Sequence, residues 1–291
     1  MKIRKTLLIA ALMLISFIFT TESATTNRVN TPAVLTNVVN PVKIALVSDV
    51  HINRGTNQAR YMANYEKVIE QVNRENVDVV IISGDLTEDG TPSEYSDFRS
   101  LTKKFKSPVY FIPGNHDIGN KKIGGKKGEI NFNRLAGYQI YFGKTWFSTT
   151  VGNVKIIGAN SCLMGSGMKK ETEMWKFLEK EMPRKPKLPI VFVTHHPLYE
   201  KNIEEKGGEY WNVEPAERFR LIGLFQQSGV VAALSGHLHR PLTNQYNNVL
   251  YYTTHPVSFG LPQGKQKPGW TLVTVSKNGI ELKPFFIEPS K

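Results

Sequence analysis

The chain has 291 residues, 40% of them hydrophobic, so it can bury a substantial core in one large α/β domain or two small ones, and we interpret it as one. Cys162 is its single cysteine, which excludes an intrachain disulfide and leaves stability to packing and to any bound metal. A formal net charge of +12 favours anionic partners such as phosphorylated substrates, nucleic acid or envelope polymers, although an ordinary basic exterior explains it equally well.

The first 23 residues have the pattern of an export signal. Lys2, Arg4 and Lys5 precede an apolar run at 7–19, and small polar residues follow. The alternative is a membrane anchor, but the run is shorter than the roughly 20 residues that span a bilayer. We therefore predict a cleaved signal peptide at 1–23 and no stable membrane span afterwards. The periplasm, the cell surface and the medium all remain open, and the mature chain keeps a charge of +10 after losing three basic residues and one acidic residue.

Residues 24–41, rich in Thr, Asn and Val with two prolines, predict a flexible tether, and we expect the folded domain at 42–291. Short apolar runs then alternate with amphipathic stretches. The predicted strands are 43–48, 77–83, 109–113, 154–159, 190–194 and 230–235, and the predicted helices are 62–76, 93–105, 171–181 and 214–227. Beyond residue 242 only strand-like runs with turn signals remain, which predicts hairpins. This order indicates helices packed on a central pair of sheets.

Polar segments follow five of the predicted strands directly, and they hold six of the seven histidines. Strand ends are where α/β sheets gather ligands. The segments are Asp49-Val50-His51, Gly84-Asp85-Leu86-Thr87, Gly114-Asn115-His116-Asp117, His195-His196-Pro197 and Gly236-His237-Leu238-His239.

Each segment taken alone is an ordinary turn, but together they predict a metal site. Residues at i and i+2 of an extended segment point the same way, so Asp49 and His51 can bind one ion together, as can His237 and His239. Carboxylate, amide and imidazole ligands without thiolate suit Mn, Fe or Zn. Asp85 is the natural bridge, because its two oxygens can hold two cations.

The ordered motifs Asp-x-His, Gly-Asp, Gly-Asn-His-Asp, His-His-Pro and Gly-His-x-His resemble those of the calcineurin-like metallophosphoesterase superfamily, over about residues 43–239. The resemblance implies a four-layer α/β/β/α sandwich with a dinuclear site at the strand ends. It implies that one metal is held by Asp49, His51 and His239, that the other is held by Asn115, His195 and His237, and that Asp85 bridges them. Whether His195 or His196 is the ligand stays open.

The resemblance also implies a mechanism, in which a metal-bound hydroxide attacks the phosphate ester. His116 is expected to give a hydrogen bond or a proton to the leaving oxygen, with Asp117 orienting its imidazole. The alternative for His116 is a loop histidine that only fills space.

Departures from the motifs of related groups narrow the substrate class. Glu88 stands where iron-tyrosinate phosphatases place tyrosine, and Asp117 stands where protein phosphatases and large nucleotidases have glutamate. The chain is most similar to class III cyclic-nucleotide and glycerophosphodiester phosphodiesterases, so a small phosphodiester is the expected substrate. A phosphomonoesterase or a nuclease is the alternative on the same scaffold, and a catalytically idle surface module ranks last. Nucleic acid is a possible but not favoured partner, and the oligomeric state is left open.

Two further features have two interpretations each, and a third, His255, has one. The segment 118–129, with four lysines and four glycines, is either a basic lid or a solvated loop. Tyr210 and Trp211 can stack on a base or pack internally. His255 lies beyond the motifs and is expected to be a structural histidine near the rim.

Overall fold

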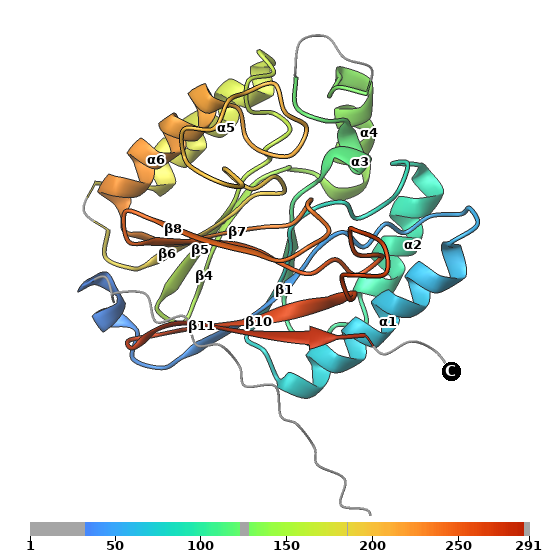
Figure 1. Ribbon diagram of the computed structural model, residues 1–291, viewed down its shortest axis with the longest axis horizontal. Coiled ribbons are helices and arrows are strands. Elements are labelled where there is room, and N and C mark those ends of the chain that lie inside the picture. Colours follow the sequence, from blue (N-terminus) through green and yellow to red (C-terminus); the bar gives the residue numbers. More distant parts are fainter. Residues whose placement is uncertain (1–32, 123–127, 185, 288–291) are drawn as a thin grey trace, which may run out of the picture.

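The computed structural model describes residues 33–122, 128–184 and 186–287. The predicted signal peptide, residues 1–23, lies outside the described residues. Two β-sheets are stacked face to face, with helices on their outer faces (Figure 1). The predicted four-layer α/β/β/α sandwich is therefore confirmed.

The first sheet has five strands in the order β11-β10-β1-β2-β3, and the second has six in the order β4-β5-β6-β7-β9-β8. Neighbours β1, β2 and β3 are parallel, as are β5, β6, β7 and β9. The strands are β1 (Val42–Val47), β2 (Val79–Ile82), β3 (Val109–Phe111), β4 (Phe147–Val151), β5 (Val154–Gly158), β6 (Ile190–Val193), β7 (Val230–Ser235), β8 (Leu242–Tyr246), β9 (Val249–Thr253), β10 (Gly269–Ser276) and β11 (Gly279–Phe286). Each predicted strand is present, and the predicted terminal hairpins are β8–β9 and β10–β11.

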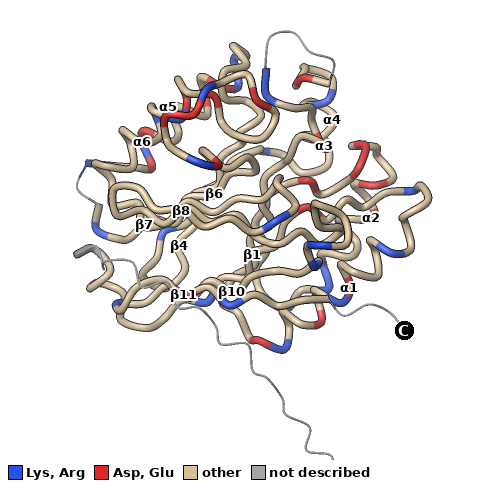
Figure 2. The backbone as a smooth tube through the Cα atoms, in the orientation of Figure 1, with Lys and Arg blue, Asp and Glu red and all other residues tan. Residues whose placement is uncertain are grey.

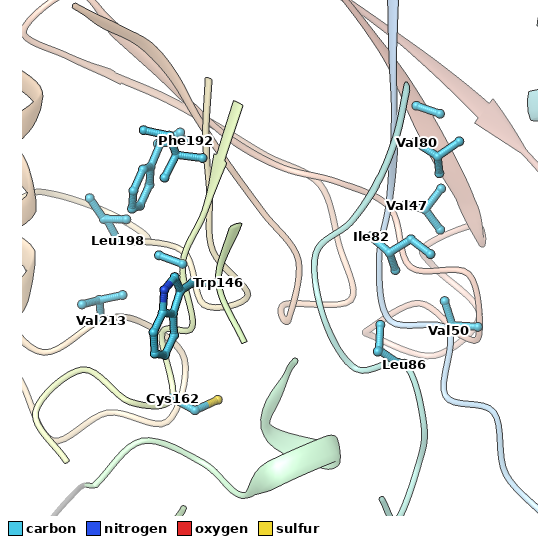
Figure 3. Packing of buried hydrophobic residues seen from close by; sticks show 14 of the residues in the cluster. Val47, Val50, Val80, Ile82, Leu86, Trp146, Cys162, Phe192, Leu198 and Val213 are labelled. Atoms are coloured by element: carbon cyan, nitrogen blue, oxygen red, sulfur yellow. The ribbon is translucent and has the colours of Figure 1, made fainter. Parts of the chain in front are cut away.

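Successive residues of the central strands pack on opposite faces of their sheet. Ile44 and Leu46 of β1 belong to the core between the sheets, whereas Ala45 and Val47 pack against the outer helices. Figure 3 shows side chains of the outer cores, with Val47 on one side of the molecule and Phe192 on the other. Burial on both faces explains why these strands are continuous apolar runs.

Helices α1 (Gln58–Glu75) and α2 (Pro92–Thr102) cover the first sheet, and α5 (Lys169–Glu181) and α6 (Pro215–Ser228) cover the second (Figure 1). The inner face of α6 is formed by Arg218, Leu221, Ile222 and Phe225, whereas Phe219 is 48% exposed.

The sequence patterns did not predict two short helices and one strand. These are α3 (Asn115–Ile118), α4 (Phe132–Phe142), and β4, a half-exposed edge strand of sequence FSTTV. Helix α4 has only Leu135 and Tyr138 buried, so its apolar periodicity is weak.

Packing begins before residue 42. Residues Ala33–Asn37 of the predicted tether form a short 3-10 helix (η1), and the side chains of Leu35 and Val38 are buried in the core between the sheets. Residues 33–41 are therefore part of the packed domain. Basic and acidic residues are interspersed along the described chain (Figure 2). No helix within the described ranges is long and apolar enough to cross a membrane.

Candidate metal centre

The five polar segments meet at one edge of the sandwich, where β1, β2, β3, β6 and β7 end. Backbone hydrogen bonds join neighbouring segments: Asp49 N donates to Gly84 O at 3.1 Å, and Gly236 N donates to His195 O at 3.0 Å. The carboxyl ends of parallel strands share an edge, so residues far apart in the sequence become neighbours there.

Five residues at this edge have a left-handed backbone conformation, which is strained for residues other than glycine. Asp49, His51, Asp85, His237 and His239 all have positive φ, between 48° and 71°. Such values are uncommon for residues other than glycine, and they cluster at functional sites.

Three of the polar segments contain a glycine at a position where a side chain would not fit. A Cβ at Gly84 would lie 2.5 Å from the His195 ring, one at Gly114 would collide with Asp85, and one at Gly236 would collide with Ser48. Larger residues there would push the polar loops apart.

The residues predicted to bind one cation, Asp49, His51 and His239, lie around Asp85, and we call them the first ligand group. His51 Nε2 lies 3.6 Å from Asp85 Oδ2 and 3.2 Å from His239 Nε2, and His239 Nε2 lies 3.5 Å from Asp49 Oδ1. These four residues offer ligand atoms that all lie within 4.8 Å of one another, and all four are buried.

The second ligand group, made of the predicted ligands Asn115, His195 and His237, approaches the same oxygen of Asp85, Oδ2. The other oxygen, Oδ1, accepts from His116 N at 2.9 Å. His195 Nε2 is 3.2 Å from Asp85 Oδ2, 3.0 Å from Asn115 Oδ1 and 3.1 Å from His237 Nδ1. Asp85, His195 and His237 also have ligand atoms within 4.8 Å of one another. Asp85 thus belongs to both clusters, as a bridging carboxylate must.

The hydrogen bonds of the four imidazoles show that the residues fit metal ions. On the outer side, His51 Nδ1 contacts Glu88 Oε2 at 2.7 Å, His195 Nδ1 contacts Ser83 O at 2.9 Å, and His239 Nδ1 contacts Phe259 O at 2.7 Å. His237 Nε2 contacts Tyr210 O at 3.2 Å. Each partner can only accept, so in the neutral imidazole each outer nitrogen carries the proton and each inner nitrogen presents a lone pair. Four lone pairs and two carboxylates converge on one space, which a cation satisfies.

The pKa values of Asp85 and His195 reflect their mutual attraction. Burial opposes protonation of His195, but the charge of Asp85 and a hydrogen bond to it raise the pKa of His195 to about 9. Burial works against ionisation of Asp85, but its histidine neighbours hold the pKa of that carboxyl well below its usual range. Burial lowers the pKa of His237 and of His239, which favours their neutral, ligand-competent form.

His196 has a different environment from its neighbour. Its Nδ1 contacts Ser161 Oγ at 2.8 Å and its Nε2 contacts Asn120 Oδ1 at 2.9 Å, so both ring nitrogens have protein partners. Burial and the nearby His237 and His195 hold the pKa of His196 well below its usual range. The geometry brings His195 to the cluster and gives His196 a supporting position behind it.

His116 lies at the rim of the first ligand group. Its ring is 4.6 Å from the His51 ring, its side chain is 31% exposed, and its Nδ1 donates to Glu88 O at 2.8 Å. The Nε2 side is therefore free to face a substrate.

The expectation that Asp117 orients the His116 ring was wrong. Asp117 is fully buried and accepts hydrogen bonds from Leu86 N, Thr87 N and Gly114 N at 2.8–3.1 Å. It fastens the loop after β3 to the loop after β2. Burial, together with the charge of Asp85, raises the pKa of Asp117 to about 6.

Glu88 does the positioning that the sequence assigned to Asp117. Its carboxylate accepts from His51, its backbone carbonyl accepts from His116, and its Oε1 lies 3.6 Å from His116 Nδ1. Sequence reasoning used Glu88 only to exclude another class of enzyme. Its place three residues after Asp85, in the same loop, was the available signal.

An aromatic rim borders the second ligand group. Tyr210 OH accepts from Asn115 Nδ2 at 2.9 Å, and the Tyr210 and Trp211 rings lie 4.8 and 5.8 Å from the His237 ring. Both side chains are partly exposed, at 38% and 39%. The two aromatics therefore border the centre and are not packed into the core.

Two buried basic side chains, Lys121 and Arg218, bind the loop that carries this rim. Lys121, 1% exposed, donates to Glu209 O at 2.6 Å and pairs with Glu214. Arg218, fully buried, donates to the carbonyls of Ile203, Glu205 and Val213. Of the predicted basic lid at 118–129, residues 123–127 lie outside the described residues, and Lys121 is an internal anchor.

His255 is apart from both ligand groups. Its ring is 7% exposed and lies 5.0 Å from the Phe286 ring, edge to face. This position agrees with the structural role predicted for it.

Comparison with known proteins identifies the class. The sequence profile of the calcineurin-like phosphoesterase family matches residues 42–241, and the chain belongs to that family. A probable glycerophosphodiester phosphodiesterase, GpdQ, from Arcobacter nitrofigilis is 28% identical over 75% of this chain and 81% of the relative. A 3′,5′-cyclic-nucleotide phosphodiesterase from Nostoc sp. is 24% identical over 86% of this chain and 96% of the relative.

Among solved structures, a dimetal phosphatase from Danio rerio has the same fold, with a TM-score of 0.56, 12% identity and coverage of 84% of this chain and 96% of that one. The protein is a metallophosphoesterase, a hydrolase of phosphoric esters whose clustered His and Asp residues can bind metal ions.

Proposed function

We propose that this enzyme hydrolyses small phosphodiesters at a two-cation centre. Asp49, His51 and His239 would hold one cation, Asn115, His195 and His237 would hold the other, and Asp85 would contribute to both. The observation that carries the proposal is the convergence of four inward-facing imidazole lone pairs on the Asp85 carboxylate. The two phosphodiesterase relatives support the preference for diesters.

The ligand set gives the chemistry. When bound, two cations at these ligands, most simply Mn, Fe or Zn, activate water and neutralise the charge that develops on the phosphoryl oxygens. The fixed backbone of the loops and the outward hydrogen bonds of the imidazoles keep the ligand atoms in place before substrate arrives.

His116 is the proposed acid. The Glu88 carbonyl accepts from Nδ1 and fixes the ring, so in the protonated imidazole the transferable proton is on Nε2. Nε2 donates this proton to the leaving alcohol oxygen as the phosphorus–oxygen bond breaks. Asp117 contributes by holding the loop that carries His116 against the loop that carries Glu88.

The test is hydrolysis by the purified protein, metal-stripped and then with added Mn, of bis(p-nitrophenyl) phosphate and p-nitrophenyl phosphate. We expect Mn-dependent cleavage with the diester favoured. A preference for the monoester would show that the enzyme is a phosphomonoesterase and would contradict the proposed preference for diesters. Absence of turnover on either ester, with two Mn bound per chain, would favour the idle surface module.

We also propose that the enzyme is exported, because a basic segment, an apolar run and small polar residues follow one another in residues 1–23. Mass spectrometry of the protein from its own cells should give a chain that begins close to residue 24. An intact N-terminus in a cytoplasmic fraction would contradict export.

A further inference from the structure

A cavity of about 760 Å³ lies beside the first ligand group. One wall is a face of α1, formed by Asn57, Arg60, Tyr61 and Asn64 at helical spacing. The other wall is the loop 258–268. Asn64 joins the walls, since its Nδ2 donates to Val257 O at 3.0 Å and to Ser258 O at 3.2 Å.

Phe259 separates this cavity from the ligand group and touches both. Its ring centroid lies 4.2 Å from that of His239 and 5.7 Å from that of His51, and its carbonyl holds His239 Nδ1. Phe259 also lines the cavity, where Tyr61 stacks on it at 5.9 Å. Phe259 therefore borders both the cavity and the first ligand group, so the two lie next to each other.

The described residues that line the cavity present donors and positive charge. Arg60 is the one charged side chain among them, and Asn57, Gln263 and Gln266 add amides. Helix α1 begins here with no acidic residue in its first turn and no side-chain cap from Asn57, so the positive end of its dipole is not compensated locally. Ser258, only 2% exposed, also lines the cavity, and its hydroxyl has no hydrogen-bond partner.

Building on the proposed function, we propose that this cavity binds a second phosphate group, carried by the alcohol part of the phosphodiester substrate. A tetrahedral anion with several acceptor oxygens matches donors that come from two walls. Arg60 is exposed, and its Nη2 contacts Tyr61 OH at 3.2 Å, which places the guanidinium over the entrance. The class of substrate is thus a diester whose alcohol bears an extra phosphomonoester.

The test compares two p-nitrophenyl phosphodiesters, one of glycerol and one of glycerol 3-phosphate, with the Mn-loaded full chain. Both release p-nitrophenol, so they differ only in the second phosphate. We expect the wild type to have a KM for the glycerol 3-phosphate ester at least about tenfold lower. Arg60→Gln should remove most of this advantage by raising that KM, with kcat and the KM for the glycerol ester unchanged.

Matched variants separate binding from folding. Arg74→Gln removes the same charge near the other end of α1 and should change neither KM. Asn57→Asp adds a capping carboxylate, which favours the helix but repels the phosphate, so the KM for the glycerol 3-phosphate ester should rise without a fall in Tm. Asn57→Ser removes the amide without adding a charge, so its KM for the glycerol 3-phosphate ester should rise less than that of Asn57→Asp.

Two results would overturn the assignment. Equal KM values for the two esters in the wild type, or a KM ratio that Arg60→Gln leaves intact, would show that the cavity does not bind phosphate even though the metal centre is active. Failure of the wild type to cleave either ester would instead overturn the proposed diesterase function, and this assignment with it.

Discussion

The two ligand groups that share Asp85 have the same pattern of hydrogen bonds to their imidazoles, but they are bordered by different parts of the chain. In each group the outer nitrogen of every imidazole is held by a carbonyl or carboxylate, and the inner nitrogen faces Asp85. The first group is bordered by Phe259, and a polar cavity lies on the other face of this residue. The second group is bordered by Tyr210 and Trp211, on a loop held by the buried side chains of Lys121 and Arg218.

The residues proposed for the chemistry and those proposed for substrate selectivity therefore lie on different parts of the chain. The ligand groups depend on residues directly after strands, whose backbones the sheets hold rigidly. The borders depend on the loops 198–214 and 257–268, which contact the ligand groups through the backbone carbonyls of Tyr210 and Phe259. Variants at the shared residue, at one group and at one border should therefore have effects of decreasing size.

The largest effect is expected for Asp85→Ala, because Asp85 is common to both groups. Turnover should fall at least about a thousandfold, since several kcal/mol of charge stabilisation is lost. Metal analysis should find fewer than two ions per chain. Asp89→Ala removes an exposed carboxylate from the same loop and should leave turnover unchanged. Full activity of Asp85→Ala would contradict the two-cation assignment.

His116→Ala tests the rim of the first group. We expect both ions to remain bound and turnover of alkyl phosphodiesters to fall by roughly 10² to 10⁴. The loss should be much smaller for nitrophenyl esters, whose leaving group departs without a proton. An equal loss for both kinds of ester would argue against His116 as the acid and for a role in positioning.

Glu88→Gln should affect the first group alone. The introduced amide oxygen can still accept from His51 Nδ1, but without the negative charge that makes the imidazole a stronger ligand. The affinity for one of the two ions should fall by about 10- to 100-fold. Calorimetric titration with Mn measures both sites, so the unchanged second site is the internal control. Equal weakening of both sites would show that the groups are not independent.

The smallest effect on turnover is expected for Lys121→Met, which loosens the border of the second group. Removing this amine leaves Glu214 and the Glu209 carbonyl without their partner, and the free energy of unfolding should fall by about 3 kcal/mol. The KM should rise several-fold while kcat changes little. Denaturant unfolding measures the stability, and Lys122→Met, at an exposed neighbour, is the control.

A second variant guards against a purely global effect. Lys121→Met combined with Glu214→Leu removes both charges of the buried pair and should recover part of the lost stability. If the double variant is no more stable than Lys121→Met, the pair is not what holds the loop.

The gathering of the seven predicted ligands could be foreseen from the sequence, because each follows a strand of β-branched and apolar residues, and strand ends of parallel sheets meet at one edge. The alternation of strands and helices likewise indicated the sandwich. The glycines at 84, 114 and 236 were recognisable because close backbone approach excludes a Cβ. These properties are local, so a stretch of a few residues carries the information.

Tertiary structure alone decided the features that depend on contacts between distant segments. His195 faces Asp85, whereas Ser161 and Asn120 occupy both ring nitrogens of His196. Asp117 binds the loop after β2, and Glu88 takes the positioning role. The cavity exists because residues 258–268 return to α1, some 200 residues earlier in the chain. Local propensity contains no record of such contacts, since they depend on how the packed sheets place their loops.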